Sequence, residues 1–223
     1  AGMEQRVTNW MDSVGARNDI AFDDMLDLDR DAGIRDPRAR AFVPLISAVR
    51  GASILTPAQT ALADRVAGWD QNHYNLAIDI NDENATDTPG ATIFDAIIRN
   101  MRQDLFGGIL SATLFERMSR TGFHEYDASP MDNVMLRILN PGSSTIAIRH
   151  DYTRGRTVNE IIRDAIELAR VQLETDFAST NPDDFTRIHH RDNLDSLTGV
   201  VGPDGFTMPH QDRGSWNQVV GFE

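Results

Sequence analysis

The acidic stretch DINDENATDTPG, residues 79–90, is the first place in the sequence where side-chain types and spacing could bind an ion. The oxygen-bearing residues Asp79, Asn81, Glu83 and Asp87 match several ligand positions of a calcium-binding EF-hand loop. Two required positions fail: Asn84 stands where the sharp turn needs glycine, and Gly90 stands where a glutamate must close the coordination shell. We therefore interpret the stretch as a solvated acidic loop between two helices and predict no calcium site.

The histidines form no metal-binding set. His189 and His190 are adjacent, so on a strand they point to opposite faces and cannot bind one ion together. The HExxH pattern is absent, and the other histidines stand alone: His73, His124, His150 and His210. We expect neither a metal nor another cofactor.

Nucleophilic and phosphate-binding motifs are also missing. The sequence has no GxSxG elbow, no SxxK motif and no cysteine to pair with a histidine. The turns GPDG and PGSS lack the lysine of a phosphate-binding loop. Residue spacing alone therefore offers no complete active site.

The charge composition argues against nucleic acid as a partner. The formal net charge is −13, from 26 Asp, 8 Glu and 21 Arg, and the chain contains no lysine. Such a surface repels a phosphate backbone. Two origins for this composition stay open, namely adaptation to high salt and a GC-rich genome that favours arginine codons. No apolar run approaches the length of a bilayer span and no targeting signal is visible, so we expect no membrane partner.

Helical patterns dominate residues 1–178, which we predict to form a helical body of the 223-residue chain. Four segments combine a capping signal with an apolar stripe at helical spacing. In RDPRARAFVPLISAVRG, Asp36 is the expected cap and Gly51 the expected end. The segments that begin at Thr56, Thr88 and Thr157 follow the same plan. The expected stripes are Phe42, Leu45, Ile46 and Val49; Leu62, Val66 and Trp69; Ile93, Ile97, Met101 and Leu105; Ile161, Ala165, Leu168 and Leu173.

Residues 179–223 have a different character and are predicted to form a β-rich tail. Short strand-like runs at 185–190, 200–201 and 216–220 are separated by glycine and proline. The fold class is therefore α+β and mostly helical. An uncovered apolar strand at 216–220 would favour pairing with a further strand or a second copy of the chain.

Four segments, in order, resemble parts of the penicillin acylase family. FDDMLDLDRDAGIRDPRARAFVPLI resembles a helical segment with a PLL-like run, and LADRVAGWDQ is similar to an L..WDG segment. PGATIFDAIIRNMRQDLF resembles the helix that follows a G.A.IF pattern, and MPHQDRGSWNQVV resembles the NRG turn and strand near the end of the catalytic β-chain. The four segments extend over most of residues 6–220.

This resemblance implies an N-terminal nucleophile hydrolase, in which helical layers enclose two antiparallel sheets. In the family a serine freed by autoproteolysis attacks an amide, its own α-amine acts as the base, and an asparagine stabilises the oxyanion. The nucleophile and that asparagine lie upstream of the matched segments, so the chain looks like an interior piece of a β-chain. The resemblance places Arg6, within EQRVTNWMDSV, where an arginine supports the asparagine. It gives Asp212, Arg213 and Gly214 a structural role, although Asp212 replaces the usual asparagine.

Two functions follow as alternatives. The first is part of an amidohydrolase that cleaves penicillin-, cephalosporin- or acyl-homoserine-lactone-type amides and is inactive in isolation. Its partners would be the α-chain, the N-terminal part of the β-chain and a small acyl-amide substrate, in the periplasm or outside the cell. The second is a helical binding module without chemistry.

Overall fold

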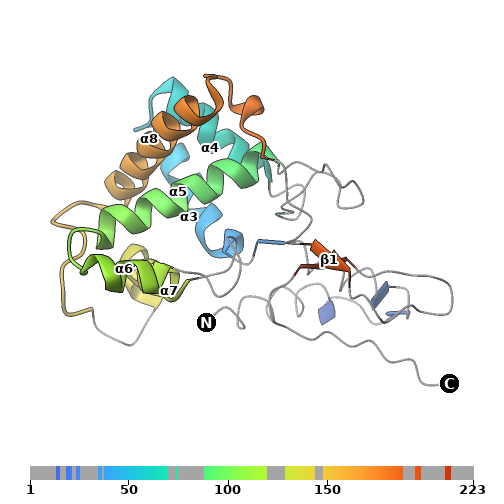
Figure 1. The fold of residues 1–223 in the computed structure, drawn as a ribbon, viewed down its shortest axis with the longest axis horizontal. Helices are drawn as coiled ribbons and strands as arrows, with labels where there is room; N and C mark the ends of the chain where they lie inside the picture. Colours follow the sequence, from blue (N-terminus) through green and yellow to red (C-terminus); the bar gives the residue numbers. More distant parts are fainter. Residues whose placement is uncertain are drawn as a thin grey trace.

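The computed structural model describes residues 14–15, 19–21, 24–25, 35–36, 38–69, 74, 88–119, 129–143, 148–187, 194–196 and 209–211. Most of these residues lie in α-helices, which confirms the mostly helical fold class (Figure 1). The α-helices are α3 (Ala39–Gly51), α4 (Pro57–Trp69), α5 (Pro89–Phe106), α6 (Ala112–Ser119), α7 (Pro130–Leu139) and α8 (Val158–Phe177). Two 3₁₀ turns, η2 (Pro141–Ser143) and η3 (Pro182–Asp184), follow α7 and α8, and the strands are β1 (Leu194–Ser196) and β2 (Pro209–Gln211).

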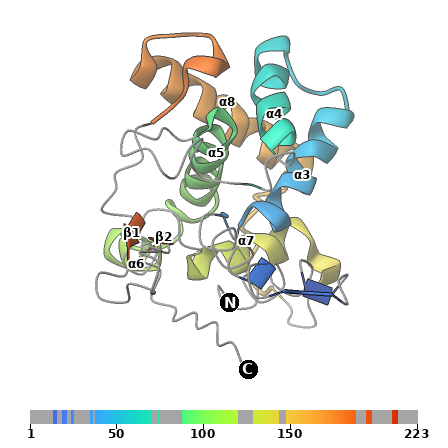
Figure 2. The same cartoon turned by 90° about the vertical axis from the view of Figure 1, so that its right-hand side faces the viewer.

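Helix α5 is the centre of the helical body. It packs against α4, α7 and α8, while α3 packs mainly on α4 (Figure 2). In its first half, residues 90–98 are all buried, whereas Arg99 and Gln103 in its second half are exposed. A helix segment that is buried on all sides lies inside the protein, so the other helices take their positions from α5.

The predicted capping signals start helices α5 and α8. The hydroxyl of Thr88 accepts the backbone N–H of Ala91 at 3.2 Å. The capping box of α8 is present, with Thr157 and Glu160 each accepting the other's backbone N–H. Helix α3 differs from the prediction because it begins at Ala39 and not directly after Asp36. The Asp36 carboxylate instead accepts hydrogen bonds from the backbone N–H of Arg38 and from its guanidinium group.

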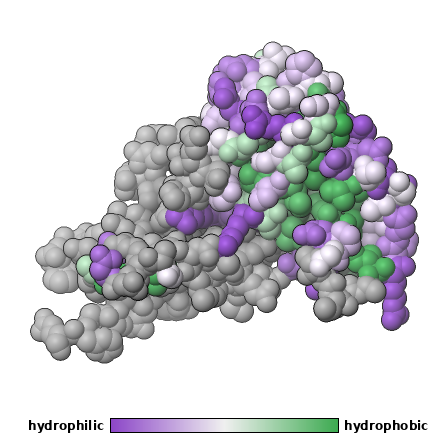
Figure 3. All heavy atoms as spheres, turned by 180° about the vertical axis from the view of Figure 1, so that it is seen from behind, coloured by the Kyte–Doolittle hydropathy of each residue, from purple (hydrophilic) through white to green (hydrophobic). Residues whose placement is uncertain are grey.

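The predicted apolar stripes are buried, with two exceptions. Leu45 of α3 is only partly buried. Leu168 of α8 is 48% exposed, so its place in the core prediction was wrong. The buried side of α8 includes Ala169 and Leu173, and Leu168 lies about 100° round the helix from Ala169. Ile54, Leu114, Ile148 and Val171 are also exposed, and Figure 3 shows apolar patches among polar side chains on the rear face.

Helices α4 and α5 approach each other closely at Gly90. A Cβ atom added to Gly90 would lie 2.6 Å from the Cβ of Trp69 and 2.8 Å from the carbonyl oxygen of Arg65. Trp69 is itself held between Tyr74 and Phe94, with ring centroids 5.5 and 5.4 Å away. The glycine that fails as a calcium ligand therefore serves the packing of two helices.

Gly90→Ala is expected to lower the free energy of unfolding by about 1–3 kcal/mol, because the added methyl group must displace packed backbone and an indole ring. Gly68→Ala is the matched control: a Cβ at Gly68 in α4 meets no atom within 4 Å. That control should leave stability equal or raise it by up to about 1 kcal/mol, since alanine favours a helix. Urea unfolding of both variants measures the difference; equal stabilities would refute the close approach.

The chain after α8 returns to the helical body before it reaches the strands. Phe185 is fully buried and packs on Phe177, with ring centroids 5.4 Å apart. The guanidinium of Arg65 in α4 forms an exposed ion pair with Asp183 at 2.6 Å. Residues 185–187 are not in a strand, so this part of the strand prediction was wrong: Phe185 is used to close the helical core.

The described strands form one antiparallel pair, with Asp195 opposite His210. The predicted strands at 200–201 and 216–220, and residues 188–190 of the first, lie outside the described residues. The division at 178/179 remains a prediction. No helix in the described part of the chain has the length and apolarity needed to span a bilayer.

Candidate functional site

The site residues predicted from the family resemblance lie outside the described residues: Arg6, Asp212, Arg213 and Gly214. The same holds for residues 79–87 of the acidic stretch and for His73, His124, His189 and His190. Of the other histidines, His150 is exposed and His210 lies in β2. Within the described ranges, no group of three or more histidine, aspartate or glutamate side chains is placed to hold a metal ion.

A cluster of buried charges lies where α3 meets α5. Arg38, just before α3, is fully buried and donates to the carboxylate of Asp36, with Nη2 2.7 Å from Oδ2. The same Nη2 donates to Asp95 of α5 at 3.0 Å. The guanidinium also lies 5.5 Å from the ring centroid of Phe94. One arginine thus joins the segment before α3 to the central helix.

Asp95 also pairs with two further arginines, one in α5 and one in the segment after η3. One of its oxygens pairs with Arg99, one turn along α5, at 2.6 Å. It also pairs with Arg187, beyond α8, at 3.5 Å. Asp95 therefore connects the segment that precedes α3 with the segment that follows η3. We call Asp36, Arg38, Asp95, Arg99 and Arg187 the Asp95 cluster.

Within the Asp95 cluster, Asp95 and Arg38 favour each other's ionised form. Burial alone raises the pKa of Asp95, but Arg38, Arg99 and Arg187 outweigh this effect and lower the pKa below its ordinary value. Burial likewise lowers the pKa of Arg38, and the charges of Asp36 and Asp95 outweigh it, so the net shift is upward. Groups whose ionised forms are stabilised in this way are poor proton donors or acceptors near neutral pH. The arrangement suits positioning of the chain and not acid–base chemistry.

A second buried ion pair joins α5 to α7. Arg102 forms a bidentate ion pair with Asp132, in which Nε lies 2.7 Å from Oδ1 and Nη2 lies 2.8 Å from Oδ2. Asp132 is fully buried and also accepts the backbone N–H of Ser129 at 2.8 Å. The Ser129 hydroxyl accepts the N–H of Met131 and donates to the carbonyl of Met118, the latter at 2.9 Å. A single carboxylate thus begins α7 and fixes it to the central helix.

Comparison with known proteins identifies the architecture. A family model for penicillin amidase matches residues 2–219. The chain belongs to the penicillin amidase family. The family resemblance that the four ordered segments predicted is thereby confirmed. A comparison with curated proteins finds no match.

A solved penicillin G acylase structure shares the fold of this chain. The chain is similar to a thermostable penicillin G acylase from Alcaligenes faecalis, with a TM-score of 0.70 and 15% sequence identity. The alignment covers 92% of this chain and 39% of that chain. At this identity the likeness concerns the fold, and this chain spans well under half of the acylase chain.

Sequence patterns did not reveal the two buried ion-pair groups, although a signal for them was present. Asp95 and Arg102 lie on the buried sides of the helix formed by TIFDAIIRNMRQDLF, among its apolar residues. A charge in such a buried position needs a buried partner. The partners Arg38 and Asp132 lie 57 and 30 residues away in the sequence, and helical spacing says nothing about such distances.

Proposed function

We propose that this chain is the helical scaffold of an amide hydrolase that works by N-terminal nucleophile acyl transfer. The observation that carries the proposal is the family match over residues 2–219. The described residues add a helical body with two buried ion-pair groups and no metal-binding cluster. In this proposal the nucleophile comes from a segment of the gene product other than this chain.

The Asp95 cluster would act by positioning. Through its ion pairs it fixes Asp36, before α3, and Arg187, after η3, to the central helix. We propose that Arg6 supports the asparagine of the oxyanion site, and that Asp212, Arg213 and Gly214 form a structural turn. A supporting residue held by a rigid framework keeps its geometry during turnover.

The substrate would be an acylated amine of the penicillin, cephalosporin or acyl-homoserine lactone type. The partners would be the α-chain and the N-terminal part of the β-chain of the same enzyme, and the location would be the periplasm or the exterior. Each of these assignments rests on family membership. The second function considered, a helical binding module without chemistry, is an outcome of the test below.

The proposal predicts that the 223-residue chain alone does not hydrolyse a panel of chromogenic acyl-amides. The longer product of the gene that encodes it should hydrolyse at least one, because that product would supply the nucleophile. Replacing the new N-terminal serine of the longer product should abolish turnover, since this residue provides both nucleophile and base. The measurement is initial rate against enzyme concentration for each form.

Two outcomes would contradict the proposal. Turnover by the purified chain alone, proportional to its concentration, would show that it contains a complete active site. Inactivity of the longer product on every amide, with this chain folded and stable, would favour the binding module.

A further inference from the structure

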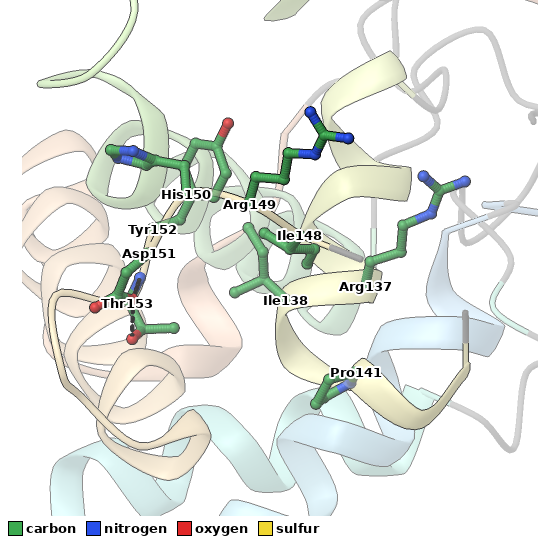
Figure 4. Close-up of a pocket in the computed structure, with 9 residues that line it drawn as sticks. All are labelled: Arg137, Ile138, Pro141, Ile148, Arg149, His150, Asp151, Tyr152 and Thr153. Carbon is green, nitrogen blue, oxygen red and sulfur yellow. Dashed lines mark hydrogen bonds between the residues drawn. The ribbon is translucent and has the colours of Figure 1, made fainter. Parts of the chain in front are cut away.

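A pocket lies between α7 and the segment 148–153, away from the Asp95 cluster. Its volume is about 350 Å³, and it is an open depression in the surface and not an enclosed cavity. Ile138, at the end of α7, and Ile148 lie in its middle, and the side chains of Arg137 and Arg149 extend past them in the same direction (Figure 4). The rings of His150 and Tyr152 lie on the opposite side of the two isoleucines.

The wall formed by residues 148–153 is attached to the helical body through Tyr152. The ring of Tyr152 contacts the ring of Phe106 in α5 edge-on, with ring centroids 5.2 Å apart. It also contacts the ring of His150, with ring centroids 4.8 Å apart. Just beyond the wall, Arg156 pairs with Asp104 of α5 at 2.6 Å. A wall attached in this way reduces the entropy that a ligand must lose in ordering the site.

The two arginines of this pocket differ from most of the arginines that the structure describes, because no acidic partner is recorded for them. In the part of the chain that the structure describes, Arg117, Arg137 and Arg149 are the arginines for which it records neither a hydrogen bond nor an ion pair. The chain as a whole has 34 acidic residues and 21 basic ones, so unpaired arginines are unexpected. Two of the three line one pocket.

The one carboxylate of the pocket does not neutralise these arginines. Asp151 accepts hydrogen bonds from the backbone N–H of Thr153 at 2.9 Å, from its hydroxyl at 2.6 Å and from the N–H of Gly155 at 3.2 Å. Figure 4 shows Asp151 turned toward Thr153, away from both guanidinium groups. The pocket therefore combines two available cations with an apolar middle.

We propose that this pocket binds a small organic carboxylate, with the anionic group at Arg137 and Arg149 and the apolar body on Ile138, Ile148 and Tyr152. Guanidinium groups bind carboxylates through charge-assisted hydrogen bonds, and the isoleucines stabilise hydrocarbon. A phosphate ion would use the arginines and leave the apolar surface exposed to water. This proposal does not depend on the amide hydrolysis proposed above.

Titration calorimetry of the purified chain tests the site with three probes at low ionic strength: hexanoate, hexanol and inorganic phosphate. Hexanoate is expected to saturate one site in the millimolar range, and hexanol and phosphate to bind more weakly. Arg137→Gln and Arg149→Gln should each weaken hexanoate binding by about fivefold, because each removes one exposed charge contact. Arg117→Gln removes an unpaired arginine that does not line the pocket and should leave binding unchanged.

Each alternative result overturns a part of the proposal. Hexanol that binds as tightly as hexanoate would remove the role of the arginines. Phosphate that binds as tightly as hexanoate would make the pocket a simple anion site, and no saturation by hexanoate would exclude it as a site. Melting curves of the arginine variants should match the parent chain, since Arg149 is exposed and Arg137 half-buried.

Discussion

Arg38→Met is expected to lower the free energy of unfolding by about 3–5 kcal/mol, the usual cost of removing one partner from a buried ion pair. The methionine would fill much of the space of Arg38, which is fully buried, and would leave the carboxylates of Asp36 and Asp95 without their shared cation. Asp95 would keep Arg99 and Arg187, so the loss falls mainly on Asp36. Urea unfolding at neutral pH, followed by circular dichroism, measures the change.

Arg50→Gln is the control for Arg38→Met. Arg50 forms an ion pair with Asp64, and both side chains are more than 40% exposed (48% and 43%). Its loss should cost no more than about 1 kcal/mol. Equal losses for the two variants would mean that burial of the Asp95 cluster has no energetic consequence.

The pH dependence of stability gives a second readout on Arg38→Met. The folded-state pKa of Asp95 lies below its unfolded value, so its ion pairs stabilise the parent protein above the unfolded pKa. This contribution is lost as the pH falls through the folded pKa. Without Arg38, Asp95 loses the largest charge that lowers its pKa while burial still raises it, so Asp95 accepts a proton at a higher pH in the variant than in the parent. The stability gap between parent and variant should therefore narrow from pH 7 toward about pH 4, near the ordinary pKa of aspartate.

Asp132→Leu is expected to lower the free energy of unfolding by about 3–5 kcal/mol, because it leaves Arg102 buried and unpaired. It also removes the carboxylate that accepts the N–H of Ser129, so the start of α7 loses part of its capping box. The double variant Arg102→Met/Asp132→Leu replaces both charges with apolar groups of similar size. It should recover much of the loss, since a buried pair and a well-packed apolar pair are often close in stability.

The comparison of the single and double variants is decisive for the role of this pair. Recovery in the double variant gives a large positive coupling between Arg102 and Asp132, which is the mark of a direct interaction. A double variant at least as unstable as Asp132→Leu would mean that the cap at Ser129, and not the pair, carries the stability.

The helices could be predicted from the sequence where local signals agreed. Thr88 and Thr157 begin α5 and α8 because their hydroxyls satisfy the first backbone N–H groups, and this chemistry is local. The capping box of α7, from Ser129 to Asp132, carries the same signal in the sequence. Its carboxylate has a second use in the contact with Arg102, which only the fold brings about.

The rest depends on contacts between distant residues. Leu168 is an apolar residue of a type usually found in the core. Its exposure depends on which side of α8 faces α5, and the sequence does not specify that side. Asp36 is a residue type that favours helix caps, but its carboxylate instead accepts a hydrogen bond from the buried guanidinium of Arg38. For the candidate site, the resemblance predicted the family, while the Asp95 cluster required the packing of α3, α5 and the segment after η3.

The central claim is that the Asp95 cluster holds the chain after η3 against the helical body and so positions the proposed site of amide hydrolysis. The most direct test is kcat/KM of the longer gene product proposed above with Arg187→Gln, which breaks the contact with Asp95. Arg65→Gln is the control, because it breaks the exposed pair with Asp183 in the same region. We predict that Arg187→Gln lowers kcat/KM by at least about tenfold through misplaced catalytic groups. Arg65→Gln should leave it unchanged, and both variants should stay folded. Equal kcat/KM for Arg187→Gln and the parent enzyme would contradict the claim.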